Sequence, residues 1–283
     1  MRIDAHQHFW NYNPARDSWI TDRMSVLKRD YLPEDLAPEL ARNDVDATIA
    51  VQADQSEAET EFLLSITESH SFIAGVVGWV DLRSDNIADR LAYFSGFDRL
   101  VGFRHIAQAE PDDYFLLHQD FVRGLRQLQP YGYTYDLLVY PRQLPAAIEL
   151  TARLPGQAFV LDHIGKPHIG NGHYGGWKQQ IRELAAHPNV YCKLSGIITE
   201  ADWQNWTPEM CRPYLDAVFE AFGPRRLMFG SDWPVCLLAG SYTQVTDLVR
   251  NYIRQCSRDN EADIMGMNAT RFYRIKTAAW ISN

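Results

Sequence analysis

The chain has 283 residues, a formal net charge of −9 and 46% hydrophobic residues, which is an ordinary composition for a globular protein. The negative charge argues against binding to nucleic acid or to an anionic membrane surface, because both need clustered Lys and Arg. No apolar run approaches the length of a membrane span, and the four cysteines lack CxxC spacing, so we expect a cytoplasmic protein with reduced thiols.

Short apolar segments alternate with amphipathic segments along the whole chain. The apolar segments are rich in β-branched and aromatic residues and are short enough to be buried strands. Strands are expected at 3–9, 47–52, 73–82, 100–105, 133–139, 158–163, 190–196 and 227–234. Helices are expected between and after them, at 33–44, 57–70, 86–94, 119–129, 142–154, 176–187, 210–223, 242–253 and 261–273.

Eight strands that alternate with helices indicate a parallel sheet with right-handed crossovers. The simplest arrangement is an α/β fold in which a (β/α)₈ barrel closes on itself, as one domain over 1–283. No low-complexity tract or Pro/Gly-rich linker divides the chain. An open doubly wound sheet is the alternative, although no Gly-rich fingerprint follows the first strand to support a dinucleotide site.

The first strand contains two histidines two residues apart. In a strand, residues i and i+2 point to the same side. Asp4, His6 and His8 are therefore expected on one face, and the opposite face is expected to carry Ile3, Ala5, Gln7 and Phe9. Two convergent imidazoles suit a metal ion or an anionic transition state.

Ionisable residues recur at the ends of the predicted strands. In a (β/α)₈ barrel the catalytic groups project from the carboxyl-terminal ends of the strands. Asp162 alternates away from His163 and is expected to face the helices. The other strand-end candidates are Asp81, Arg104, His105, Asp136, His163, Lys166, Lys193, Ser195 and Asp232.

Several motifs resemble those of the amidohydrolase superfamily: His6-x-His8 on the first strand, a His after the sixth, and GSDWP on the eighth. The segments GFRHIAQAEPDDYFL, YDLLV, LDHIGKP, NVYCKLSG and RLMFGSDWPV are similar to the amidohydrolase-related branch that hydrolyses sugar-acid lactones, such as L-fuconolactone and L-rhamnonolactone. The similarity extends from Arg2 to about Tyr273. It implies a distorted (β/α)₈ barrel and an enzyme that hydrolyses a cyclic carboxylic ester.

The resemblance also bears on metal content. Binuclear members of the superfamily use a carboxylated Lys or a Glu on strand four and a His on strand five. Here strand four ends in Arg104 and His105, and strand five offers Asp136. The resemblance therefore implies either a single zinc ion or a reaction that needs no metal. The residues that would hold the zinc are His6, His8, His163 and Asp232.

The same resemblance suggests roles for the strand-end residues. Asp232 is expected to be the base that deprotonates the attacking water, with His163 and His105 as further catalytic candidates. His163 and Lys166 could hold the substrate or polarise the lactone carbonyl. The substrate-binding candidates are Arg104, Lys166, Asp81, Asp136, Lys193, Trp10 and Trp233.

Structural roles are open for several of these residues. Asp232 could be a helix N-cap or a salt-bridge partner. Arg104 could form an ion pair with Asp81 or Asp136, and Lys193 could belong to a buried structural network with Ser195. His168 and His173 could touch the substrate or lie exposed in the loop after the sixth strand. Core packing is expected for Trp19, Trp203 and Trp206.

We therefore predict a hydrolase that opens a sugar-derived lactone to its aldonic acid in carbohydrate catabolism. The partner is a small-molecule lactone, and homo-oligomer formation stays open. GxSxG is absent, which disfavours a Ser-His-Asp mechanism. Two alternatives are a metal-dependent decarboxylase on the same kind of barrel and a sugar-acid-binding protein without catalysis.

Overall fold

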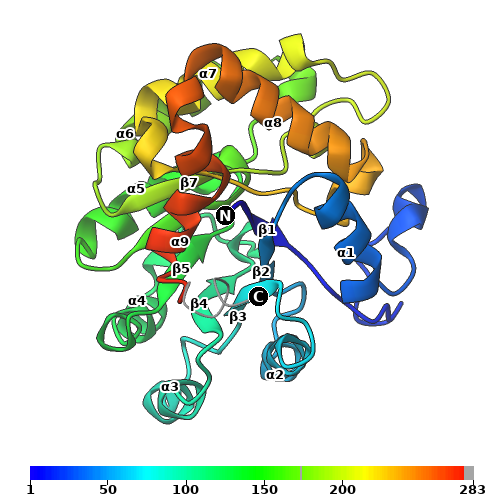
Figure 1. Ribbon diagram of the computed structural model, residues 1–283. Coiled ribbons are helices and arrows are strands. Elements are labelled where there is room, and N and C mark those ends of the chain that lie inside the picture. The colour runs from blue at the N-terminus through cyan, green and yellow to red at the C-terminus, as the bar shows by residue number, and fades with distance from the viewer. Residues whose placement is uncertain (173, 277–283) are drawn as a thin grey trace.

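Eight parallel strands surrounded by helices form the fold in the computed structural model, which describes residues 1–172 and 174–276 (Figure 1). Each strand pairs with the next in sequence order from β1 to β8. The strands are β1 (Ile3–Gln7), β2 (Ala47–Val51), β3 (Ile73–Gly78), β4 (Leu100–His105), β5 (Thr134–Leu137), β6 (Phe159–Leu161), β7 (Val190–Leu194) and β8 (Leu227–Phe229).

The helices form an outer layer around the strands, as Figure 1 shows along the barrel axis. Local signals start several of them: Ser56 and Ser241 each accept a hydrogen bond from the backbone N–H three residues later. The helices are α1 (Pro33–Arg42), α2 (Glu57–Thr67), α3 (Ile87–Phe94), α4 (Gln119–Leu125), α5 (Leu144–Arg153), α6 (Gly175–Ala185), α7 (Pro208–Phe222), α8 (Tyr242–Cys256) and α9 (Asn268–Phe272).

The predicted (β/α)₈ barrel is confirmed, and the predicted strands are mostly too long at their carboxyl ends. The eighth strand ends at Phe229 rather than near residue 234, and the third at Gly78 rather than near residue 82. Beyond Phe229 and Gly78 the regular pairing with the neighbouring strands ends and the chain continues as loop. As a result, residues predicted as strand lie at the mouth of the barrel instead.

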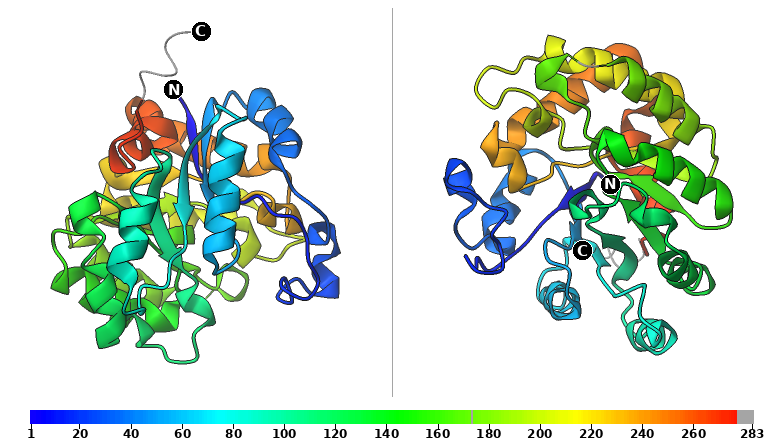
Figure 2. Two further views of the ribbon diagram at one scale, coloured as in Figure 1. Left: turned by 90° about the horizontal axis from the view of Figure 1, so that it is seen from below. Right: turned by 180° about the vertical axis from the view of Figure 1, so that it is seen from behind.

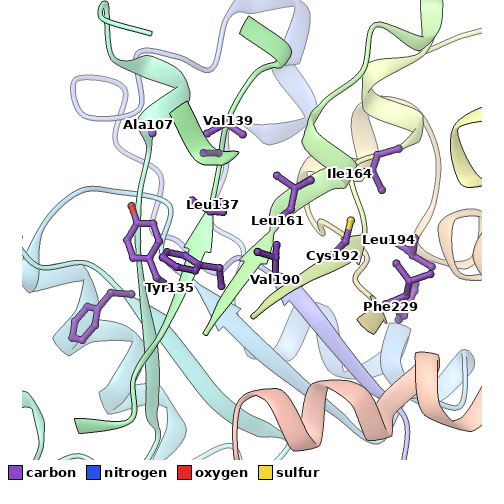
Figure 3. Close-up of a cluster of buried hydrophobic side chains, with 14 of the residues drawn as sticks. Ala107, Tyr135, Leu137, Val139, Leu161, Ile164, Val190, Cys192, Leu194 and Phe229 are labelled. Atoms are coloured by element: carbon purple, nitrogen blue, oxygen red, sulfur yellow. The ribbon is translucent and has the colours of Figure 1, made fainter. Parts of the chain in front are cut away.

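Two groups of buried side chains hold the barrel together. One lies between the strands and the helices and includes Leu137, Leu161 and Cys192, which Figure 3 shows side by side. The other fills the barrel interior with short and β-branched residues from several strands, such as Val51, and with Tyr273, which follows α9. The interior is therefore closed at its amino-terminal end, and a binding site is left only at the other end.

The barrel closes between β8 and β1 without a regular ladder. The Asp232 N–H donates to the His6 carbonyl at 2.8 Å, and the His8 N–H donates to the Trp233 carbonyl at 2.7 Å. Gln7 and Trp233 form an isolated parallel bridge. This junction brings the first histidines beside the segment that follows β8.

A long excursion connects β1 to α1 and contains the 3₁₀ turn Asp22–Leu27. In Figure 2 this blue segment extends toward the end of the barrel opposite the N-terminus and α9. Within residues 1–172 and 174–276, no helix combines the length and apolar character that crossing a bilayer requires.

Candidate active site

A cavity of about 390 Å³ lies at the carboxyl-terminal ends of the strands. This volume is within the range of small-molecule sites. Its charged and polar lining comes from β4 and from the segments that follow β1, β4, β6 and β8. These lining residues are His8, Arg104, Gln108, His163, Lys166 and Asp232.

His6, His8 and Asp232 bring three potential metal ligands together. The Nε2 atoms of His6 and His8 are 3.2 Å apart, and Asp232 Oδ1 lies 3.4 Å from His8 Nε2 and 3.8 Å from His6 Nε2. Ligand atoms about 2.0–2.2 Å from one tetrahedral zinc are separated by a little over 3 Å, so this donor set fits the ion. His163 Nε2 lies 3.8 Å from the same carboxylate oxygen.

The second histidine of the pair is fixed by the backbone of β2. His8 Nδ1 lies 2.7 Å from the Val51 carbonyl, which can only accept, so Nδ1 carries a proton and Nε2 is the nitrogen that faces His6 and Asp232. His6 Nε2 is also approached at 3.3 Å by Arg104 Nη1. A cation bound here would compete with the guanidinium for that lone pair.

The predicted facing of β1 is wrong for Asp4. The register of β1 shifts between Asp4 and Gln7, so strict alternation does not continue through the strand. Ile3 and Ala5 pack in the barrel interior, whereas the Asp4 carboxylate accepts hydrogen bonds from Ser231 and from Tyr242 of α8.

Asp162, which the sequence placed toward the helices, lies at the centre of the buried polar network. Its carboxylate is 3.2 Å from His6 Nδ1 and accepts a hydrogen bond of 3.1 Å from Arg104 Nη1. Alternation along β6 puts Asp162 on the same face as Val160, in the interior. His163 then returns to the interior because its backbone turns at φ 53°.

Beneath the cavity, Lys193 joins two carboxylates. Its Nζ lies 2.5 Å from Asp136 and 3.0 Å from Asp162, and Tyr273 donates a hydrogen bond of 3.0 Å to Asp136. Lys193 and Asp136 are fully buried and do not line the cavity. Neither residue is therefore placed to touch a ligand in this cavity, and the geometry favours a structural network, the alternative that was open for Lys193.

His163 is held by a serine and by a glycine on the segment after β7. Ser195 Oγ accepts from the His163 backbone N–H at 3.3 Å and lies 3.0 Å from His163 Nδ1. A Cβ at Gly196 would lie 2.6 Å from the imidazole, so only glycine fits there. Nearby, Lys166 lines the cavity and pairs with Glu200 at 3.3 Å.

The protonation states suit a base and neutral imidazoles. Burial alone would raise the pKa of the Asp232 carboxyl, but the nearby His163 and the hydrogen bond from His8 outweigh it and lower that pKa below its ordinary value. Burial lowers the pKa of both His6 and His163 well below the usual range for histidine. At neutral pH the site therefore holds an ionised Asp232 carboxylate near the uncharged rings of His6 and His163.

Besides Lys193 and Asp136, three further residues predicted to be catalytic or substrate-binding lie outside the cavity. His105 faces the opposite side of β4 from Arg104, where its Nε2 lies 2.7 Å from Glu110 and its ring stacks on Phe115. Asp81 is exposed and accepts a hydrogen bond from the Arg83 backbone.

The third of these residues is an aromatic side chain. Trp233 is 2% exposed and packs against Phe9 and Tyr31, because the turn after Asp232 directs its indole into the core. Trp233 therefore does not reach the cavity, although it directly follows Asp232 in the sequence.

The apolar side of the cavity contains residues that sequence reasoning missed. Trp10 lines it as predicted, but Trp19, expected in the core, also lines it and is 43% exposed. Met24 and Tyr140 join them. Trp19 and Met24 belong to the irregular excursion after β1, where no periodic pattern predicts the direction of a side chain. Only the path of this excursion over the mouth of the barrel shows that they line the cavity.

The loop after β6 contains His168 and His173, which the sequence analysis named as residues that could touch the substrate. His168 is exposed and does not line the cavity. His173 lies outside the described residues.

The fold and the site define a hydrolase-type barrel with paired histidines on β1 and an aspartate after β8. The chain belongs to the amidohydrolase family, whose sequence profile matches residues 3–275. It is 45% identical to an L-fucono-1,5-lactonase of Burkholderia multivorans, covering 99% of this chain and 98% of that one. A second L-fucono-1,5-lactonase, from Burkholderia ambifaria, is 38% identical over 97% of this chain and 96% of its own length.

A solved structure is equally similar. The crystal structure of an amidohydrolase from Burkholderia multivorans with bound Zn superposes with a TM-score of 0.94. It shares 45% sequence identity and covers 98% of this chain and 100% of the other. The match extends over both the barrel and the loops that line the cavity.

Proposed function

We propose that this enzyme hydrolyses a sugar-derived lactone, such as L-fuconolactone, to the open aldonic acid. The lactonase names of relatives at 45% and 38% identity support the substrate class. The observation that carries the proposal is the ionised Asp232 carboxylate, 3% exposed at the base of a cavity and within 3.8 Å of three imidazoles.

In the proposed reaction Asp232 takes a proton from the water that attacks the lactone carbonyl. When Ser195 donates to His163 Nδ1, the Nε2–H of His163 is directed toward the developing oxyanion. Arg104 Nε has no hydrogen-bond partner among residues 1–172 and 174–276, and Arg104 lines the cavity. The Nε atom itself is buried, so the part of the guanidinium that lines the cavity is what is suited to a ring or hydroxyl oxygen of the substrate.

We propose that one zinc ion, where present, is held by His6, His8 and Asp232. His163, whose Nε2 lies 3.8 Å from Asp232 Oδ1, is the candidate for a fourth ligand. The bound Zn of the amidohydrolase from Burkholderia multivorans supports this choice of metal. When bound, such an ion polarises the carbonyl and lowers the pKa of a coordinated water. The Arg104 guanidinium beside His6 supplies a fixed positive charge in the same place, so hydrolysis with or without the metal is part of the proposal.

We also place the reaction in the cytoplasm, within the breakdown of sugar acids. The free thiols of Cys192, Cys211, Cys236 and Cys256 support a reducing compartment.

A pH-stat assay with a panel of aldonolactones tests the function, because ring opening releases acid whereas decarboxylation releases carbon dioxide. We expect Asp232→Asn to lower kcat by about 10²-fold or more, the usual cost of losing a positioned base. Asp81→Asn is the matched control: the same chemical change at an exposed aspartate should leave kcat unchanged. Near-normal hydrolysis by a folded Asp232→Asn variant would contradict the role of Asp232.

A further inference from the structure

The junction between β1 and β8 carries His6, His8 and Asp232, yet no regular strand pairing holds it together. Two backbone hydrogen bonds cross it, from Asp232 to His6 and from His8 to Trp233. The relative position of the proposed base and the histidines therefore depends on further contacts. Those contacts converge on one side chain.

Asp4 supplies the additional link. Its Oδ1 accepts from the backbone N–H of His6 at 3.1 Å and of Ser231 at 2.9 Å. Its Oδ2 accepts from Ser231 Oγ at 2.5 Å and from Tyr242 Oη at 3.0 Å. The side chain is fully buried and does not line the cavity, so it has no access to substrate.

The segment that Asp4 holds is conformationally demanding. Asp232 adopts φ 59°, in the left-handed region, which L-residues enter at a cost. Ser231 precedes it with both its N–H and its hydroxyl bound to Asp4, and Ser231 Oγ accepts the N–H of Trp233 on the other side. A residue persists in this region only when its neighbours determine its geometry.

We propose that Asp4 is a positioning residue: its carboxylate joins His6, Ser231 and Tyr242 and thereby fixes Asp232 relative to the paired histidines. The inference rests on the proposed role of Asp232. A carboxylate is suited to this task because it accepts at every position and donates at none. An asparagine would direct its NH₂ group at one or more of the four donors.

The test uses the full-length variants Asp4→Asn, Ser231→Ala and Tyr242→Phe. For each, kcat and KM are measured with an aldonolactone, zinc affinity by chelator competition, and melting temperature by calorimetry. We expect Asp4→Asn to lower kcat and zinc affinity by about 10- to 100-fold with KM nearly unchanged. Losses of this size are usual for residues that orient metal ligands without binding the metal themselves. Tyr242→Phe and Ser231→Ala should change the same two quantities less, since each removes only part of the network.

Asn189→Ala is the control for a purely structural loss. Asn189 donates to the carbonyls of Leu154 and Gln157, among the loops at the amino-terminal side of β6 and β7. This variant should lower the melting temperature while leaving kcat and zinc affinity unchanged.

Folded Asp4→Asn with wild-type kcat and zinc affinity would overturn the proposal. If that variant does not fold, unchanged values in both Ser231→Ala and Tyr242→Phe overturn it equally. If the wild type hydrolyses none of the lactones, the proposed function fails, and zinc affinity together with a crystal structure of Asp4→Asn still decides the positioning role. An Asp232 carboxylate in its wild-type position in that crystal structure would reject it.

Discussion

The charged side chains beneath the cavity are buried together in one group. Lys193 touches Asp136 and Asp162, and Asp162 in turn touches His6 and Arg104. An isolated buried charge is costly, but each of these has an opposite charge and a hydrogen bond. The network therefore fixes the orientation of His6 from below while the opposite edge of the imidazole faces the site.

Lys193→Met should lower the free energy of unfolding by about 3–5 kcal/mol, because it leaves two buried carboxylates without their shared cation. The double variant Lys193→Met/Asp136→Asn should recover part of this loss, since one of the two carboxylates becomes neutral. Denaturant unfolding of the single and double variants measures the coupling. An increase in KM without a loss of stability would instead mean that Lys193 binds substrate.

Among the elements, the excursion between β1 and α1 contributes most to the apolar side of the cavity. Trp10 is anchored in it by a hydrogen bond of 2.9 Å from its indole N–H to the Arg29 carbonyl. Trp19 packs edge-on against Trp10 with ring centroids 6.2 Å apart, yet much of its surface is free. An anchored ring behind an exposed one makes a firm surface on which a sugar ring can lie.

Trp19→Ala should raise KM for the lactone about fivefold with little change in kcat, corresponding to about 1 kcal/mol of lost aromatic contact. Steady-state kinetics with the preferred lactone measures this. Tyr114→Ala, at an exposed tyrosine that does not line the cavity, is the control and should leave KM unchanged. A fall in kcat alone would show that Trp19 acts on the chemical step rather than on binding.

At the scale of the whole molecule, the proposed metal ligands lie on both sides of the junction between the first and last strands. His6 lies on β1, His8 directly follows β1, and Asp232 belongs to the segment after β8. A ligand that binds both sides of this junction stabilises only the closed barrel. Bound metal should therefore affect global stability as well as turnover.

Zinc at about 100 times its dissociation constant should stabilise the protein by about 2.7 kcal/mol, which corresponds to a rise of about 4–5 °C in melting temperature. His8→Ala should remove this rise, and chelation should reverse it in the wild type. His168→Ala, at an exposed histidine outside the cavity, should keep it. Equal stabilisation of the wild type and His8→Ala would place the ion elsewhere.

The amino-acid sequence by itself determined the barrel and the set of strands that carry the chemistry. Runs of buried residues mark each strand because both faces of a parallel strand are covered, and this signal is local. Asp232, His8, Arg104, His163 and Lys166 were all predictable as cavity residues, because they follow or end such runs.

Only the tertiary structure decided which polar residues face the cavity and which lie behind it. The register shift in β1 turns Asp4 away from the histidines, and the left-handed backbone of His163 brings its side chain inward beside Asp162. His105 and Trp233 are adjacent in sequence to cavity residues but face other surroundings, and Asp81 is exposed away from the cavity. These outcomes depend on single backbone dihedrals and on contacts between strands far apart in sequence, which a period-two pattern does not encode.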